Sequence, residues 1–144
     1  MSNPGPASST SIHPQNLGTN QALRLISVIK GLSVATLGDT AIPVINTSYY
    51  VPTAVIITNA SVDVHSVALG VYTATGGAGG SGSAILSTAA LTSNTSSAYA
   101  TVSAATSTTT TQTAQTLYVN QTTATAAGTV DVYVYGYDLS GPQQ

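Results

Sequence analysis

The chain has 144 residues, of which only two are Lys or Arg and four are Asp or Glu, so its net charge is −2 at neutral pH. Two cations cannot neutralise the phosphates of a nucleic acid, and no apolar run approaches the roughly 20 residues that a membrane-spanning helix needs. Disorder is disfavoured too, because disordered chains combine low hydrophobicity with high net charge. Such low charge suits a protein whose surface is largely buried against partners, with a secreted Thr-rich monomer as the alternative.

Residues 1–20 are predicted to form an extended N-terminal arm. Prolines are scattered among Ser, Asn and Gly, and Ile12 and Leu17 supply the apolar side chains. Such a composition builds no core. We expect the arm to lie along a partner surface, and a tail lying on its own domain is the alternative. No charged start precedes an apolar run, so no signal peptide is expected.

The first apolar-rich stretch, Ala22–Leu37, is expected to form β-structure. Helical spacing fits part of it, but its β-branched residues and central Gly31 favour a strand pair, or one long strand bent at Gly31. Gly38–Asp39 is then expected to be a turn. The next strand, Thr40–Val44, contains Pro43, which cannot donate a ladder hydrogen bond and therefore predicts a sheet edge or a bulge.

The middle of the chain alternates between short strands and polar loops. Asn59–Ser61 is expected to be a turn, and the Gly-rich segment Gly76–Ser83 a flexible loop, because glycine adds no side chain to pack. The expected strands are Ala54–Thr58, Ser66–Thr73, Ala84–Ala89, Ala98–Val102 and Thr116–Asn120.

The closing stretch, Thr129–Leu139, reads T-V-D-V-Y-V-Y-G-Y-D-L. Side chains alternate across a strand, so its valines share one face and its tyrosines share the other with Asp131. The valines require a core, which Val67, Leu69, Val71, Leu117 and Val119 can provide. Each tyrosine ring buries a large apolar area and keeps one polar tip, so the tyrosine side is expected to be covered by a second subunit.

These elements predict an all-β protein. Short strands recur without intervening helical segments, which is the pattern of a single β-sandwich or jelly roll of about 8–10 antiparallel strands. We expect residues 21–144 to form this domain, preceded by the arm.

No residue pattern indicates catalysis. Gly77–Gly82 matches G-x-G-x-x-G but lacks the following helix and the acidic residue of a dinucleotide site. His13 and His65 are far apart and lie in no recognisable hydrolase or zinc pattern. Asp131 is expected on a strand, exposed or hydrogen-bonded to a neighbour, and Asp138 in the turn after it. We therefore expect no enzyme activity, no cofactor and no metal site.

Several segments, in order along most of the chain, resemble a group of tailed-bacteriophage capsid cement (decoration) proteins. The segments are Gly38–Val44, Ile56–Ser61, Ala68–Ala74 before the Gly-rich loop, Thr116–Thr123 and Thr129–Leu139. The chain departs from the commoner pattern in its lower charge and its long Thr run.

The resemblance implies a β-sandwich or jelly roll on the outer surface of an icosahedral head, where it ties neighbouring major capsid subunits together. The expected partners are the major capsid protein and the chain itself, as a homodimer or homotrimer. A glycan-binding head-fibre or adhesin-type module is the alternative, because tyrosines can form a platform for sugars. The residues expected at the interface are Ile12, Leu17, Tyr49, Tyr50, Tyr133, Tyr135 and Tyr137.

Overall fold

The computed structural model describes residues 23–91, 96–106 and 109–140, and these contain eight β-strands and no α-helix. The all-β prediction is confirmed, whereas the predicted arm, with Ile12 and Leu17, lies outside the described residues. A short 3-10 helix, η2, covers Gly77–Gly79. The strands are β1 (Leu23–Ser33), β2 (Gly38–Pro43), β3 (Tyr50–Ala60), β4 (Ala68–Tyr72), β5 (Ala84–Ala90), β6 (Ser96–Ala104), β7 (Thr116–Thr123) and β8 (Thr129–Asp138).

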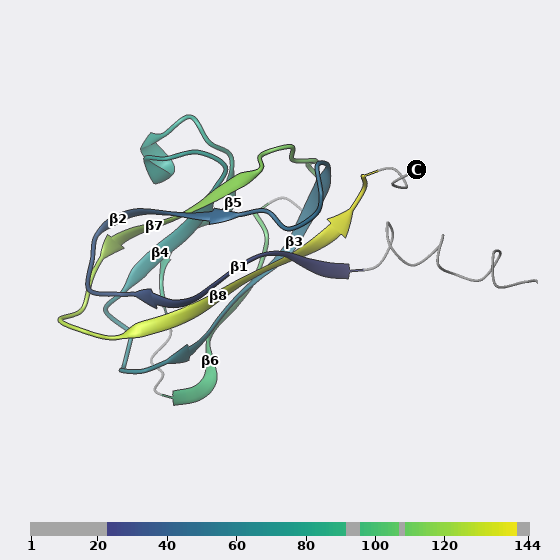
Figure 1. Ribbon diagram of the computed structural model, residues 1–144. Helices are drawn as coiled ribbons and strands as arrows, with labels where there is room; N and C mark the ends of the chain where they lie inside the picture. Colours follow the sequence, from purple (N-terminus) through teal and green to yellow (C-terminus); the bar gives the residue numbers. More distant parts are fainter. Residues whose placement is uncertain (1–22, 92–95, 107–108, 141–144) are drawn as a thin grey trace, which may run out of the picture.

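The strands form two four-stranded antiparallel sheets, with the orders β1-β8-β3-β6 and β2-β7-β4-β5. Figure 1 shows the two sheets packed face to face. The pairs β1–β8, β2–β7, β3–β6 and β4–β5 each join a strand of the first half of the chain to its mirror-image strand in the second half. This is a long antiparallel ribbon rolled up on itself, which is the jelly-roll arrangement.

The core lies between the sheets, where the alternating apolar residues of both meet. Val130, Val132 and Val134 of β8 are fully buried, as their spacing predicts. The partners expected for them belong to the same buried cluster: Val67, Leu69, Val71, Leu117 and Val119. One face of β8 therefore closes the core, and the other faces outward.

β1 is one long strand that is irregular at Gly31, the second of the two predicted alternatives. Its pairing with β8 shifts between Ile29 and Leu32, and Gly31 has a φ of +66°. The Gly31 N–H donates to Asp131 Oδ1 at 2.8 Å. The Asp131 carboxylate thus accepts a hydrogen bond from a backbone N–H group that the shift in pairing takes out of the strand ladder.

β2 lies at the edge of its sheet, as Pro43 predicts. After this strand the chain crosses towards β1. The Ile45 N–H donates to the Ile26 carbonyl at 2.8 Å, and Ser27 Oγ donates to the Pro43 carbonyl at 2.7 Å. These contacts tie the two sheets together along one open side of the sandwich.

One predicted turn is wrong, and the other is misplaced, because β3 continues to Ala60 and the bend lies at residues 61–62. Gly38–Asp39 lies inside β2 and pairs with β7, and the bend comes earlier, at residues 34–36. Asn59 lies in β3 although its φ is +55°, and its amide donates to Asp131 Oδ2 at 3.2 Å. Gly and Asn favour positive φ in irregular strands as well as in turns, so the residue types alone do not distinguish the two.

Candidate interaction surface

The outward face of β8 carries a row of tyrosines flanked by apolar residues of its two neighbouring strands. In register, Tyr133 lies between Val28 of β1 and Ile56 of β3, and Tyr135 lies between Leu25 and Ala54. We call this surface the tyrosine face, made of Leu23, Leu25, Val28, Ala54, Ile56, Tyr133, Tyr135 and Tyr137.

The tyrosine face is accessible along its length. Leu23 and Tyr137 at one end are 56% and 42% exposed, and Tyr133 and Tyr135 are half-buried. Tyr133 and Tyr135 line a hollow of about 330 Å³ together with Ile56 and Thr58. A partner side chain can enter this hollow and contact the flanks of both rings.

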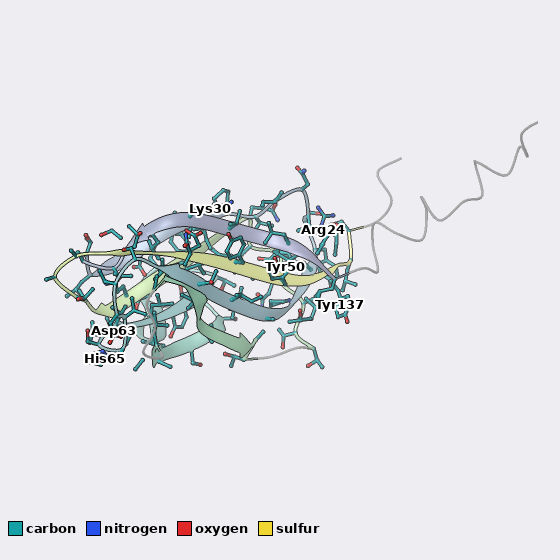
Figure 2. The ribbon with its side chains drawn as sticks, turned by 90° about the horizontal axis from the view of Figure 1, so that it is seen from below. Arg24, Lys30, Tyr50, Asp63, His65 and Tyr137 are labelled. Carbon is teal, nitrogen blue, oxygen red and sulfur yellow. The ribbon has the colours of Figure 1, made fainter. Side chains whose placement is uncertain are left out.

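Charged groups lie at the ends of this surface rather than in its middle. Asp131 follows the tyrosines on the same face of β8, but it is 8% exposed and accepts hydrogen bonds from Gly31 and Asn59. Figure 2 shows Lys30 and Tyr137 well separated along the molecule. The centre of the tyrosine face is therefore apolar with phenolic hydroxyls, a composition typical of the buried centre of a protein interface.

Tyr50 was predicted at the interface, and the structure corrects this. Its side chain is fully buried in the core, and its hydroxyl donates to the Ala114 carbonyl at 2.8 Å. Burial raises the pKa of the Tyr50 phenol to about 12. Tyr50 of β3 pairs with Asp138, which lies on the inner side of β8. The Tyr50 ring therefore points into the sandwich. It offers no surface to a partner.

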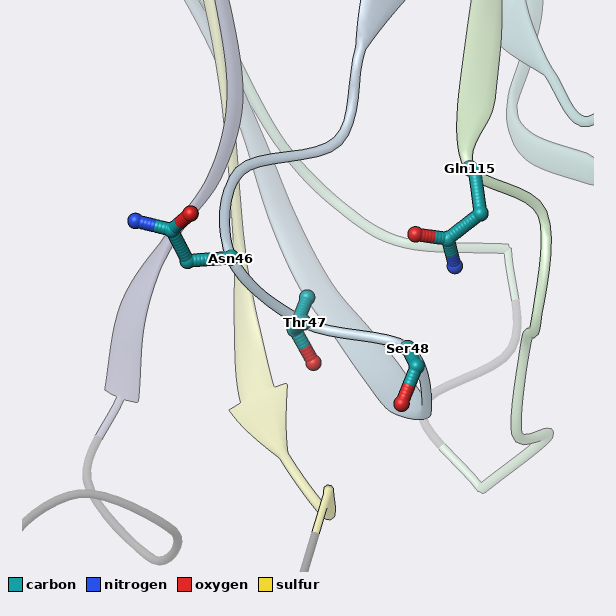
Figure 3. A pocket seen from close by; sticks show the side chains of 4 residues that line it. All are labelled: Asn46, Thr47, Ser48 and Gln115. Carbon is teal, nitrogen blue, oxygen red and sulfur yellow. The ribbon is translucent and has the colours of Figure 1, made fainter. Parts of the chain in front are cut away.

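Tyr49 is 42% exposed. It lies in the loop before β3 and is therefore not part of the strand pairing that forms the tyrosine face. The same loop borders a second hollow, of about 550 Å³, lined among the described residues by Asn46, Thr47, Ser48 and Gln115. In Figure 3 the Gln115 side chain extends from the segment before β7 towards the β2–β3 loop. We call this hollow the polar pocket.

A buried polar network holds the wall of the polar pocket. Thr47 Oγ1 donates to Asp138 Oδ1 at 2.5 Å, and the Ser140 N–H donates to the same oxygen at 2.9 Å. Arg24 Nη1 lies 2.6 Å from Asp138 Oδ2. Asp138 therefore ends β8 as a buried ion-pair partner, and its predicted place in the turn after this strand is wrong.

The environment of Asp138 affects its titration in two opposing directions. Burial by itself would raise the pKa of this carboxyl, but the hydrogen bonds from Thr47 and Ser140 and the Arg24 charge outweigh it. The net result is a pKa below the ordinary value for aspartate. The carboxylate therefore stays charged in the folded chain.

The Gly-rich loop is held against β2 by a hydrogen bond to Asp39. The Gly76 N–H donates to Asp39 Oδ2 at 2.9 Å, and the Asn120 amide donates to Asp39 Oδ1 at 2.8 Å. A nucleotide phosphate would meet a carboxylate there, and η2, at three residues, is no phosphate-binding helix. The loop caps the end of the β2–β7 pair.

Sequence reasoning found the tyrosines of β8 but missed their neighbours and the polar pocket. Leu25 and Val28 share the tyrosine face only because the pairing of β1 with β8 shifts between Leu25 and Ser27. Simple alternation would put them on opposite faces. The lining residues Ser48 and Gln115 are 67 positions apart in the chain, and no local pattern connects them.

The remaining chemistry is sparse. His65 Nδ1 lies 3.2 Å from Asp63 Oδ1 on an exposed loop. Across residues 23–91, 96–106 and 109–140, no group of three or more His, Asp or Glu side chains could hold a metal ion, and no helix is long and apolar enough to cross a membrane.

Comparison with protein-family models, with curated proteins and with solved structures found no match to the chain.

Proposed function

We propose that this chain is a structural virion protein: a capsid cement (decoration) protein that binds the outer surface of a tailed-phage head and ties neighbouring major capsid subunits together. The observation that carries the proposal is the tyrosine face, an aromatic and apolar surface across three strands of a chain with six charged side chains. The ordered sequence resemblance to cement proteins supports the same function. No catalytic role is proposed.

The proposed mechanism is the burial of surface area. Aromatic side chains dominate interface energetics because each buries a large area at low cost in conformational entropy. A stable contact buries about 1,600 Å² in total, divided between the two partners. The arm, with Ile12 and Leu17, and a second or third copy of the chain would add to the area that the tyrosine face buries. Repetition over a symmetric shell then multiplies contacts that are individually weak.

A reconstitution experiment tests the function. Heads of the phage that encodes this chain are assembled without it, mixed with the purified chain and heated while DNA release is followed with a dye. We expect the chain to co-sediment with the heads and to raise the temperature of DNA release. A chain that neither co-sediments nor protects the heads would contradict the proposal.

The second candidate is a glycan-binding head-fibre or adhesin-type module. The polar pocket is the observation that favours it, because its lining side chains are uncharged hydrogen-bonding groups. A monomer that binds sugar arrays and does not bind heads would establish this alternative in place of the cement function.

A further inference from the structure

The polar pocket lies between two segments that are distant in the sequence and fixed in space. The β2–β3 loop forms one wall, with Thr47 and Ser48, and Gln115 projects from the segment that leads into β7 (Figure 3). Its volume, about 550 Å³, is within the range of small-molecule sites. Asn46, Ser48 and Gln115 are all exposed there, so a solute can reach them.

Both walls are held by hydrogen bonds on either side of the pocket. The loop is anchored at one end by the Ile45–Ile26 backbone bond and at its centre by the bond from Thr47 to Asp138. Tyr50 and Gln112 exchange two backbone hydrogen bonds, of 3.1 and 2.7 Å, which join the loop to the opposite wall. A site held in this way loses little conformational entropy when a ligand binds.

The charges near the pocket cancel each other. Asp138 is buried behind Thr47 and is paired with Arg24. None of the described lining residues carries a charge. Among these described residues an anionic ligand therefore finds no lining cation to pair with, and a cationic ligand finds a carboxylate that is already neutralised. A purely apolar ligand would leave the amides and hydroxyls of the lining without partners, which is unfavourable.

The polar groups that remain available can both donate and accept hydrogen bonds. The exposed Ser48 hydroxyl shares one hydrogen bond, of 3.3 Å, with the Ser140 hydroxyl and can still make a further one. Gln115 uses only its Nε2 in a described bond, to the Thr113 carbonyl at 3.0 Å, which leaves its Oε1. Within the described residues, no hydrogen bond engages the Asn46 side-chain amide. Such mixed donors and acceptors match the vicinal hydroxyls of a sugar.

An exposed aromatic residue follows these groups in the β2–β3 loop. Tyr49 directly follows Ser48 and is 42% exposed. An aromatic face provides an apolar platform for the C–H side of a sugar ring, while its hydroxyl stays wet. We propose that the polar pocket binds a neutral saccharide, with Ser48 and Gln115 contacting the hydroxyls and Tyr49 forming the apolar side. This inference rests on the second candidate function and specifies its ligand; it does not depend on the cement function, because its residues do not belong to the tyrosine face.

The test uses the full chain, isotopically labelled, and follows its amide resonances by NMR. The probes are neutral hexasaccharides of glucose, mannose, galactose and N-acetylglucosamine, with a sialylated trisaccharide as the charged comparison. We expect at least one neutral probe to shift the resonances of residues 46–49 and 115, with a Kd of about 1 mM or tighter. We expect the sialylated probe to bind no better than its neutral core.

Two substitutions and a matched control make the result specific. Gln115→Ala and Ser48→Ala, which both alter exposed side chains, should each weaken binding about tenfold, as expected for losing one well-placed hydrogen bond. Thr122→Ala alters an exposed residue near the other end of β7 and should leave the affinity unchanged. The proposal is overturned if no neutral probe shifts these resonances, if both pocket variants bind as the wild type does, or if only the charged probe binds.

Discussion

Tyr49 and Tyr50 are neighbours in the sequence and have opposite environments. Tyr49 is exposed, whereas the Tyr50 ring is fully buried and its hydroxyl donates to the Ala114 carbonyl. Tyr50 is the first residue of β3 and lies on its core side, whereas Tyr49 lies in the loop before the strand. The sequence offers no means of choosing between two identical side chains, because the choice depends on the pairing of β3 with β8.

Burial of Tyr50 predicts a specific alkaline instability. The pKa of its phenol is about 12 in the folded chain and about 10 when unfolded, so between these values the unfolded state loses its proton first. The stability contribution is therefore complete well below pH 10, and about 2 kcal/mol of it is lost by pH 12. The free energy of unfolding, measured with denaturant at several pH values, should fall less steeply between pH 10 and pH 12 for Tyr50→Phe than for the wild type. An identical pH dependence of the two proteins would contradict the assignment.

Asp138 predicts the corresponding acid instability. Its pKa is lowered by folding, so its contribution is present above the unfolded value of about 3.9 and is lost as pH falls through the folded value. Asp138→Asn should lower the free energy of unfolding by about 2 kcal/mol at pH 7, because it leaves Arg24 without its partner. Below pH 4, the free energy of unfolding of this variant should depend less on pH than that of the wild type. Urea unfolding from pH 2 to pH 7 measures both effects. The exposed Asp63→Asn serves as the control and should change stability by less than about 0.5 kcal/mol.

At the scale of the strands, β8 is the element that the sequence describes best. Its strict alternation identifies the buried valines and the outward tyrosines correctly. β1 is described less well, because its two pairing irregularities, after Leu25 and after Ile29, change which residues face the core. Such bulges depend on long-range contacts, such as the bond from Gly31 to Asp131, which no local pattern encodes.

The close approach of β8 to β3 depends on Gly136. A Cβ at this position would collide with the Val51 carbonyl oxygen and lie 2.9 Å from the Pro52 Cα, and both are backbone atoms that cannot rotate away. Gly136→Ala should therefore destabilise the chain by about 1–3 kcal/mol, as overpacking does. Gly79→Ala, where a Cβ would meet nothing within 4 Å, should be almost neutral. Thermal unfolding compares the two, and equal midpoints would contradict the predicted steric role of Gly136.

At the scale of the whole molecule, composition and strand spacing predict the all-β sandwich, but the strand order requires the structure. Every pairing of the rolled ribbon except β4–β5 joins strands that are not consecutive in the chain. The tyrosine face is likewise a product of topology, because β1, β8 and β3 come from both ends of the sequence. Only its central row, Tyr133 to Tyr137, is visible as a local pattern.

The proposed function predicts that substitutions on the tyrosine face affect head binding and not folding. Replacing Tyr133, Tyr135 and Tyr137 together with Ser removes the aromatic row while leaving the core valines in place. Tyr137→Ser alone changes the most exposed of the three and is the variant least able to disturb the fold. The matched control is Tyr118→Ser, a half-buried tyrosine on β7 in the other sheet. Circular dichroism should give the same β-sheet spectrum for all of these proteins.

The central measurement is the number of copies bound per head when these variants compete with the wild-type chain for heads that lack it. The triple variant should bind at least about tenfold more weakly, because aromatic residues at the centre of an interface contribute most of its binding free energy. Tyr137→Ser should show a smaller loss in the same direction, and Tyr118→Ser should bind as the wild type does. Equal occupancy by the folded triple variant and the wild type would contradict the assignment of the tyrosine face as the capsid-binding surface.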